Sequence, residues 1–235
     1  MPTGNDLLRK AAPHVGESYH LGSLAPKDNA LWKGPWDCAE FASWCVYQVT
    51  GRLYGCDNNN GNPSRADAYS GFWQRDAHSL GRAVSVAIAA QTPGAVLLRY
   101  PQPNLIGHVV FCDGRGGTIE AHSRATGVIR SVVAARRWDT GVLIPGVEFT
   151  QSAAPVPSTQ PLMVLRLTTP LMRGRIVLAV QRALRKKGIN PGSVDGIYGI
   201  QTIAAVNAFQ VMNGLVPDGE VGAETANALG VAFPK

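Results

Sequence analysis

Hydrophobic residues recur with two different periods along the first part of the chain. The segment WDCAEFASWCVYQVTG, residues 36–51, has apolar side chains every three or four positions from Cys38 onward, which is the spacing of one buried helical stripe. After the turn at Pro93–Gly94 the period changes to two in AVLLRY, IGHVVFC, TIEAH and GVIRSVV, which are separated by polar turn sequences. The pattern predicts a helix that begins at Cys38, followed by four antiparallel strands.

The last part of the chain contains a repeated pattern of turn and helix. Residues 195–202 read DGIYGIQT, and residues 218–225 read DGEVGAET. Asp-Gly followed by a second glycine is typical of a tight turn, and apolar residues follow each copy at helical spacing. Before both copies, the stripe of Val177, Val180 and Leu184 predicts a helix that a glycine then caps. Three short helices are therefore expected.

A polar segment separates these two parts. Residues 151–161 are rich in Pro, Ser, Ala and Gln and follow neither period, which is typical of a linker. We therefore expect an N-terminal domain over residues 1–150, a linker over 151–161 and a C-terminal domain over 162–235. The expected fold class is α+β for the first domain and all-α, with three helices, for the second. A chain of 235 residues has room for one medium and one small domain.

Composition and charge narrow the class of protein. The chain is 45% hydrophobic and 16% charged, which excludes a disordered polymer. The net charge is +6, and the basic residues are denser after residue 161. They suit an anionic polymer such as nucleic acid or bacterial wall, but several close one predicted helix, where they simply oppose its dipole. No apolar run is long enough to span a bilayer, and the N-terminus lacks the features of a secretory signal.

Cys38 is the candidate nucleophile. Asp37 is a good N-cap, and Glu40 three residues on completes the pattern of a capping box. The thiol then lies in the first helical turn, where unpaired N–H groups and the helix dipole favour the thiolate and could also stabilise an oxyanion. The spacing of the four cysteines matches neither a zinc site nor a disulfide framework. We expect no metal and no cofactor.

His108, near the start of the second predicted strand, is the candidate base. Its neighbour Gly107 leaves room for the close approach of another element. On the next strand, Glu120 and His122 point to one face because their spacing is two. Either side chain could hydrogen-bond the imidazole and fix its tautomer, and the spacing leaves both open.

This constellation resembles the NlpC-type cysteine peptidases, which are papain-like wall hydrolases with the nucleophile in DCSGF and the base in GHVGIY. Asp37-Cys38 resembles the nucleophile pair, Gly107-His108-Val109 the base, and Tyr19 in SYHLG the aromatic residue upstream. The resemblance covers residues 10–135 and implies a papain-like domain in which the nucleophile helix packs on an antiparallel sheet.

The chain departs from this family pattern at two places. The family's third polar residue precedes an alanine about a dozen positions after the base, and Glu120, followed by Ala121, stands there in place of the usual histidine. His122 is the rival orienting residue. The segment DCAEF also replaces DCSGF, so Glu40 could alter the charge preference for substrate.

The C-terminal part resembles the three-helix peptidoglycan-binding domain of bacterial wall hydrolases. Gln181, residues 195–202 and residues 205–210 match its pattern in order. Together the two resemblances imply a peptidoglycan hydrolase that cuts a stem-peptide amide, expected to be of the D-glutamyl-diaminopimelate endopeptidase type. Tyr19, Asp37 and Tyr198 are the candidate substrate-binding residues.

Other functions share the same residues. An N-acetylmuramoyl-L-alanine amidase would use the same nucleophile, and so would an acyltransferase or transamidase. A wall-binding structural module with an incidental thiol is the rival from a different class. The expected partner is peptidoglycan rather than nucleic acid, without membrane insertion. With no export signal, the protein is expected to be made in the cytoplasm and to reach the periplasm or wall through a holin, a phage-like particle or a secretion system. In the last case an immunity protein is expected.

Overall fold

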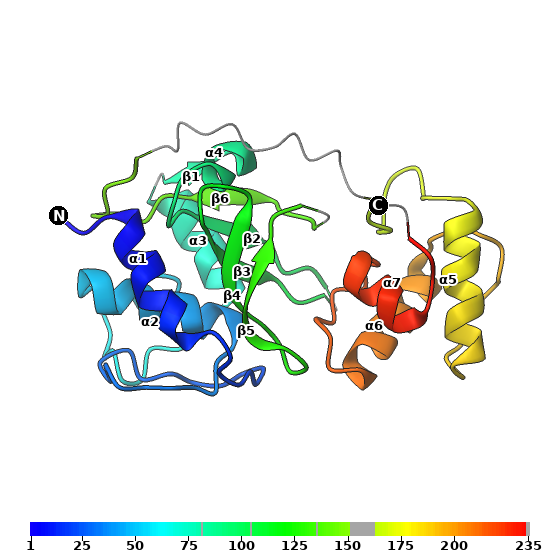
Figure 1. Cartoon of the computed structure of the whole chain (residues 1–235), viewed down its shortest axis with the longest axis horizontal. Helices are drawn as coiled ribbons and strands as arrows, with labels where there is room; N and C mark the ends of the chain where they lie inside the picture. The colour runs from blue at the N-terminus through cyan, green and yellow to red at the C-terminus, as the bar shows by residue number, and fades with distance from the viewer. Residues whose placement is uncertain (81, 104, 135, 151–162, 234–235) are drawn as a thin grey trace. The chain divides into compact units, whose positions relative to one another are not determined.

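The computed structural model describes residues 1–80, 82–103, 105–134, 136–150 and 163–233. The chain divides into two compact units (Figure 1). The first begins at Met1, extends to Val133 and resumes at Trp138. The second contains the described residues from 163 onward. The linker predicted over residues 151–161 lies outside the described residues.

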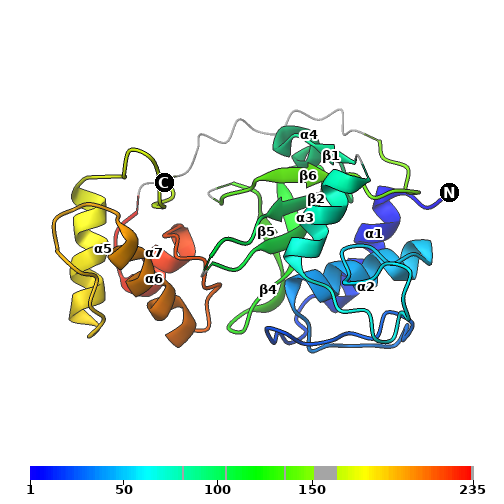
Figure 2. The same cartoon turned by 180° about the vertical axis from the view of Figure 1, so that it is seen from behind.

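The first unit places its helices around one sheet. They are α1 (Gly4–Ala11), the short 3₁₀ helix η1 (Ala12–His14), α2 (Cys38–Thr50), α3 (Ser70–Ser79) and α4 (Val86–Ala90). Helix α2 begins at Cys38, as the sequence predicts, because the Asp37 side chain accepts a hydrogen bond from the Glu40 N–H at 2.8 Å. It ends at Thr50 and is capped by Gly51, whose φ of 67° suits a glycine. Helix α2 contacts β3 and β4, and α3 contacts β2 (Figure 2).

The sheet contains six strands in the described part of the chain, all paired antiparallel, in the order β1-β6-β2-β3-β4-β5. The strands are β1 (Ala83–Val84), β2 (Val96–Arg99), β3 (His108–Cys112), β4 (Gly117–Ser123), β5 (Gly127–Val132) and β6 (Thr140–Val142). The four strands predicted from the sequence are β2 to β5. The α+β fold class is therefore confirmed, while β1 and β6 add two short strands at one edge.

Alternation along the strands divides the sheet into two faces. Val109 and Phe111 of β3 belong to the main core with α2. Val110 and Cys112 belong to a second cluster on the other face. The pairing of β3 with β4 is restricted to Phe111 with Ile119 and its neighbouring pair. These paired residues lie at the end of β3, whereas the candidate base, His108, is its first residue.

The second unit contains three helices among residues 163–233, as predicted: α5 (Arg175–Lys186), α6 (Ile200–Met212) and α7 (Ala223–Leu229). Its core is formed by apolar residues from all three helices and from the turns between them. Phe209 of α6 and Leu229 of α7 are buried in it. The all-α part of the fold prediction is confirmed.

A buried glutamine anchors each of the two repeated turns. The Gln181 Nε2 atom of α5 donates to Ile197 O and to Thr202 Oγ1, both at 3.1 Å, and the Gly196 N–H donates to Gln181 Oε1 at 2.8 Å. In the second copy, Gln210 of α6 makes the equivalent bonds. In each copy the glutamine amide forms hydrogen bonds with backbone groups inside the turn. The sequence repeat is therefore also a repeat of the same hydrogen-bond pattern, which we call the glutamine latch.

Tyr198 connects the two copies. Its side chain is fully buried, and its hydroxyl donates to Gly219 O at 3.0 Å. The structure gives Tyr198 a structural role, which corrects the substrate-binding role expected from the resemblance. An enclosed side chain has no surface to offer a ligand.

Candidate active site

The thiol of Cys38 lies in the first turn of α2, against the backbone of β3. Cys38 is the first residue of α2 and is 6% exposed. The backbone N–H groups of Val109 and Ala39 donate to its sulfur. Val109 directly follows His108, so the fold brings the candidate nucleophile beside the segment that carries the candidate base.

His108 is held by a carboxylate on the neighbouring strand. The His108 Nε2 and Glu120 Oε2 atoms are 2.6 Å apart, and both side chains are buried. Glu120 is fixed in turn by Thr118, whose hydroxyl donates to Glu120 Oε1 at 2.6 Å. The three residues therefore form a chain of hydrogen bonds along one face of the sheet.

His122, the rival orienting residue, makes a different contact. Its Nδ1 atom is 2.9 Å from Thr126 Oγ1. Its ring centroid is 6.0 Å from that of His108, at an interplanar angle of 80°. Spacing of two places Glu120 and His122 on the same face, as predicted, but of the two it is the glutamate whose hydrogen bond to His108 is observed.

Burial dominates the electrostatics of the thiol. It raises the pKa of Cys38 to about 12, and the negative charge of Asp37 adds to the rise. The Val109 N–H, the Arg99 charge and the Ala39 N–H act in the opposite direction. The sequence predicted that the start of the helix favours the thiolate. The structure differs because the cost of burying a charged sulfur exceeds the effect of the nearby donors.

Tyr19 and Asp37 flank the thiol. Tyr19 forms an isolated bridge with Trp36, and burial together with the charges of Cys38 and Asp37 raises the pKa of its hydroxyl. Burial also raises the pKa of Asp37 to about 7, although the Glu40 and Gly22 N–H groups donate to its carboxylate. The structure thus brings together Cys38, Tyr19 and Asp37, as the resemblance implied.

Glu40 points away from the site. Its side chain is fully buried, forms an ion pair with Lys27 and accepts hydrogen bonds from the Ala25 N–H at 2.8 Å and the Ala68 N–H at 2.6 Å. The prediction that Glu40 completes a capping box is wrong. So is the idea that it alters the charge preference for substrate, because an enclosed carboxylate paired with Lys27 offers no charge to a ligand.

Two site residues were missed at the level of sequence. Arg99 of β2 is 5% exposed and is the cross-strand partner of His108. Trp138 lies just before β6, with its ring centroid 6.2 Å from that of His108 at an interplanar angle of 26°. Arg99 ends a run of apolar residues, which is a weak signal for a buried polar site. No periodic pattern surrounds Trp138.

Gly107 is required by close packing beside His108. A Cβ atom at this position would lie 2.4 Å from Ser70 Oγ and 2.6 Å from Arg99 O. The expectation that this glycine permits the close approach of another element is met, and the elements that approach are α3 and β2. The start of β3 is thereby fixed between β2 and α3.

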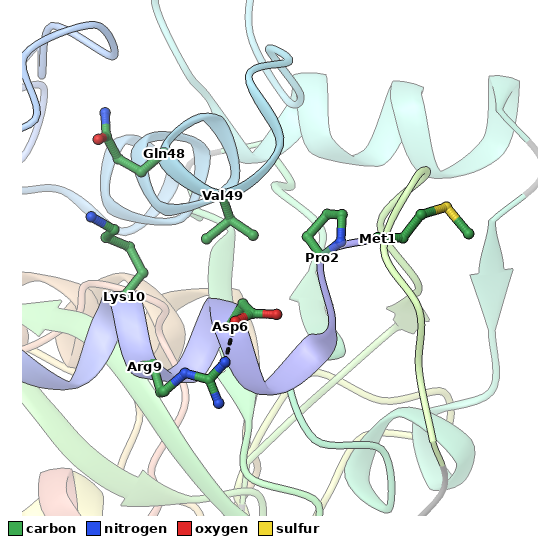
Figure 3. Close-up of a pocket in the computed structure, with 7 residues that line it drawn as sticks. All are labelled: Met1, Pro2, Asp6, Arg9, Lys10, Gln48 and Val49. Atoms are coloured by element: carbon green, nitrogen blue, oxygen red, sulfur yellow. Dashed lines mark hydrogen bonds and ion pairs between the residues drawn. The ribbon is translucent and has the colours of Figure 1, made fainter.

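A hollow of about 680 Å³ lies away from this site, between α1 and the end of α2. Figure 3 shows that Arg9 and Lys10 reach it from α1, and Gln48 and Val49 from α2. Gln48 follows Cys38 by ten residues, about 15 Å along a helix. The hollow is therefore separate from the thiol.

Two structural features are absent from the described residues. No group of three or more His, Cys, Asp or Glu residues is arranged to hold a metal ion. No helix there has both the length and the hydropathy needed to cross a membrane.

Fold and site together define an α+β unit with a cysteine at a helix start, whose sulfur accepts from the residue after His108, and with a buried His108–Glu120 pair. A three-helix unit follows. Residues 173–229 match the family model described as a putative peptidoglycan binding domain, which confirms the resemblance predicted for the C-terminal part.

Curated relatives match part of the chain. The N-acetylmuramoyl-L-alanine amidase XlyA of Bacillus subtilis (strain 168) is 36% identical over 124 residues, covering 46% of this chain and 41% of XlyA. The amidase CwlH of the same organism is 39% identical over 72 residues, covering 28% of this chain and 27% of CwlH. The chain therefore spans less than half the length of these relatives.

Solved structures similar to this chain include the NlpC/p60 domain of the peptidoglycan hydrolase SagA, at 22% identity and a TM-score of 0.42. The match covers 60% of this chain and 99% of that one. The peptidoglycan hydrolase RipB from Mycobacterium tuberculosis is 19% identical, with a TM-score of 0.42, over 60% of this chain and 64% of RipB.

Proposed function

We propose that the chain is a peptidoglycan hydrolase in which the thiol of Cys38 attacks an amide bond of the bacterial wall. The observation that carries this proposal is the position of the thiol. It is held by the N–H of Val109, the residue that follows His108, whose Nε2 is engaged by a buried carboxylate at 2.6 Å. A nucleophile, a base and a residue that orients the base are the three parts of a thiol hydrolase.

The raised pKa of Cys38, about 12, defines how the reaction begins. The thiol is protonated at neutral pH, so His108 accepts its proton as the sulfur attacks the carbonyl. Glu120 fixes the tautomer through Nε2, which assigns proton exchange with the thiol to Nδ1. Backbone N–H groups at the start of α2 stabilise the oxyanion. His108 then protonates the leaving amine, and water releases the acyl-enzyme.

Tyr19 and Asp37 are our candidates for substrate contacts at this site, with His122 as the alternative orienting residue. The peptidoglycan-binding match of residues 173–229 supports wall binding by the C-terminal unit. Attachment to an insoluble polymer raises the local concentration of substrate for the catalytic unit. The domain limits 1–150, 151–161 and 162–235 stay a prediction.

The bond that is cleaved has two candidates. The NlpC-type motifs favour an endopeptidase that cuts between D-glutamate and diaminopimelate. The names of the curated relatives, all N-acetylmuramoyl-L-alanine amidases, favour the amide between sugar and peptide. Action in the periplasm or wall, delivery by a holin, particle or secretion system, and an immunity protein in the last case are part of the same proposal.

Incubation of purified sacculi with the protein, followed by mass analysis of the soluble fragments, tests the proposal. The parent should release fragments with new amines, and their masses identify the bond. Cys38→Ala should release none, whereas Cys112→Ala, which removes a buried thiol from the opposite side of β3 to Val109, should act as the parent does. Equal blank traces from all three proteins would reject the hydrolase and favour the wall-binding module.

A matched pair of variants tests the orienting residue. Glu120→Gln removes the charge that holds His108 and should lower kcat by about 10- to 100-fold, the usual scale for losing part of a general-base system. His122→Gln should have an effect under about threefold. The reverse order would transfer the orienting role to His122.

A further inference from the structure

A second hollow of the first unit lies at the end of α2 that is far from the thiol. It has a volume of about 810 Å³ and is lined by the end of α2, the loop of residues 57–63 and α3. Gly51, which lines it, follows Cys38 by 13 residues, about 20 Å along a helix. The volume is in the range of ligand-binding pockets. The hollow is separate from the thiol and shares no lining residue with the hollow of Figure 3.

The loop on one side of this hollow is fixed by a buried carboxylate. Asp76 of α3 is 3% exposed, and its Oδ2 atom accepts hydrogen bonds from the Gly55 N–H at 2.8 Å and from Asn59 Nδ2 at 2.6 Å. Arg75 donates to Asp76 Oδ1 at 2.7 Å and to Cys56 O at 2.6 Å. These bonds attach the loop to α3 without any ligand, so the polar groups that the loop presents are preorganised.

Three polar side chains of the lining are exposed: Arg52, Asn58 and Asn60. The Asn58 amide uses only its oxygen, which accepts the Asn60 N–H at 3.0 Å. Within the part of the chain that the structure describes, the guanidinium of Arg52 and the side-chain amide of Asn60 form no hydrogen bond. An amide both donates and accepts hydrogen bonds, and so does a hydroxyl. The lining therefore suits a ligand rich in hydroxyl and amide groups.

The charges of the lining nearly cancel. Arg75 is paired with Asp76, which leaves Arg52 and the carboxylate of Asp57 as the other charged groups of the lining. One positive and one negative charge give little net attraction to a polyanion. The balance of charge therefore favours a neutral ligand.

Apolar surface completes the lining. Tyr47 of α2 is half-buried, and Leu80, which follows α3, is 51% exposed. A tyrosine ring offers an apolar body together with a polar hydroxyl. A sugar ring has the matching character, because hydroxyl groups surround its edge and C–H groups cover its faces. Amides, one aromatic ring and balanced charge therefore point to a neutral sugar.

We propose that this hollow binds an N-acetylated amino sugar of the glycan strand, as a second contact between the catalytic unit and its polymeric substrate. The inference rests on the proposed function, in which the substrate is peptidoglycan. Because a glycan strand is much longer than the distance of about 20 Å along α2, one polymer reaches both the hollow and Cys38. Holding the polymer at a second point raises the effective concentration of its amide bonds at the thiol.

Titration of the ¹⁵N-labelled full chain with chitotetraose, a neutral tetramer of N-acetylglucosamine, is the first test. The side-chain amide signals of Asn58 and Asn60 should shift and saturate, and their assignment to residues separates this site from any binding by the second unit. Arg52→Leu/Asn60→Leu should raise Kd by about 10- to 100-fold, the scale of two lost hydrogen bonds. Asn5→Leu, at an exposed position of α1, is the matched control and should bind as the parent does. Unchanged signals outside the hollow verify that each variant folds.

Hydrolysis is the second test, with soluble glycan strands of several disaccharides compared with muropeptides of a single disaccharide. The double variant should raise KM for the long strands by about 10-fold, with kcat changed less than about twofold, because it removes binding that is equal in ground state and transition state. Its KM for the short muropeptides should stay closer to that of the parent.

The two tests fail separately. Shifts at Asn58 and Asn60 without any hydrolysis would reject the proposed function and support the sugar site. Hydrolysis without these shifts, or shifts with poly(glycerol phosphate) and none with chitotetraose, would overturn the sugar site. A double variant that equals Asn5→Leu in KM for long strands would overturn its role as a second contact.

Discussion

Replacing Lys27 by Met is expected to destabilise the first unit by about 3 to 5 kcal/mol at pH 7, the usual cost of removing one partner of a buried ion pair. Lys27 and Glu40 are both fully buried and paired with each other. Glu40 would keep the N–H donors of Ala25 and Ala68, but its charge would have no counter-ion. Lys27 also donates to Ala66 O at 2.5 Å, which would lose its partner.

The loss in free energy of unfolding caused by Lys27→Met should depend on pH in a defined direction. Burial raises the pKa of Glu40, and the Lys27 charge opposes that rise. Without Lys27 the pKa of the carboxyl rises further, so the folded variant keeps a proton that the unfolded chain releases above about pH 4.3. A raised folded-state pKa gives stability that is complete below the unfolded pKa and is lost as pH rises, by up to about 1.4 kcal/mol per pH unit. The difference in free energy of unfolding between the parent and Lys27→Met should be small near pH 4 and largest above pH 7.

Urea unfolding followed by tryptophan fluorescence measures this change in one unit. All tryptophans of the chain lie in the first unit, at Trp32, Trp36, Trp44, Trp73 and Trp138. Lys33→Met, at an exposed position, is the matched control and should change the free energy of unfolding by less than about 0.5 kcal/mol. Lys27→Met/Glu40→Gln, which leaves no charge in the site, should abolish the added pH dependence.

The reasoning is refuted by either of two results. One is a Lys27→Met protein as stable as Lys33→Met at every pH. The other is a double variant that keeps the pH-dependent deficit of the single one, because the buried charge of Glu40 would then not be its cause.

Three more outcomes are expected. Gly107→Ala should abolish hydrolysis and cost about 1 to 3 kcal/mol by overpacking, because its Cβ would meet atoms at 2.4 and 2.6 Å; fluorescence unfolding measures the loss. Gln210→Ala should cost about 1 to 3 kcal/mol in the second unit by leaving a buried turn N–H unpaired, measured by calorimetry. Asp37→Asn keeps the helix cap and removes a charge that raises the pKa of Cys38, so alkylation of Cys38 above pH 7 should be faster.

Each of these three predictions has a matched control variant. Gly199→Ala, whose Cβ would meet no atom within 4 Å, should fold and act as the parent does. Gln201→Ala and Asp28→Asn, both at exposed positions, control for the glutamine and the carboxyl changes. If Gly107→Ala behaves as its control does, the close packing at Gly107 is contradicted. If Gln210→Ala does, the glutamine latch of the second turn is contradicted. If Asp37→Asn does, the charge of Asp37 does not raise the pKa of Cys38.

The start of α2, the four central strands and the helical second unit could be predicted because each has a strong local signal. Asp37 caps the helix, and the strands alternate clearly. Strands β1 and β6 contain only two and three residues, too few for a period to appear. Trp138 shares this difficulty, because its position follows from β6.

Other features of the first unit depend on the tertiary structure. The position of Lys27 against Glu40 results from a loop that folds back under α2, and a buried lysine is rare enough that no local pattern predicts it. The choice between Glu120 and His122 depends on tertiary contacts, which put the Glu120 carboxylate 2.6 Å from His108 Nε2 and His122 Nδ1 2.9 Å from Thr126 Oγ1. The direction of the Cys38 pKa shift depends on burial by residues distant in sequence.

The two N–H groups that donate to the Cys38 sulfur have a consequence for how this chain tolerates substitution. The main-chain N–H groups of Val109 and Ala39 donate to the sulfur. Every residue except proline has such an N–H group. The position of the Cys38 sulfur therefore does not depend on which side chains stand at positions 109 and 39. The helix start DCAEF therefore supplies its N–H donors whatever side chains Ala39 and Glu40 carry, and the Glu40 carboxylate is buried in the interior.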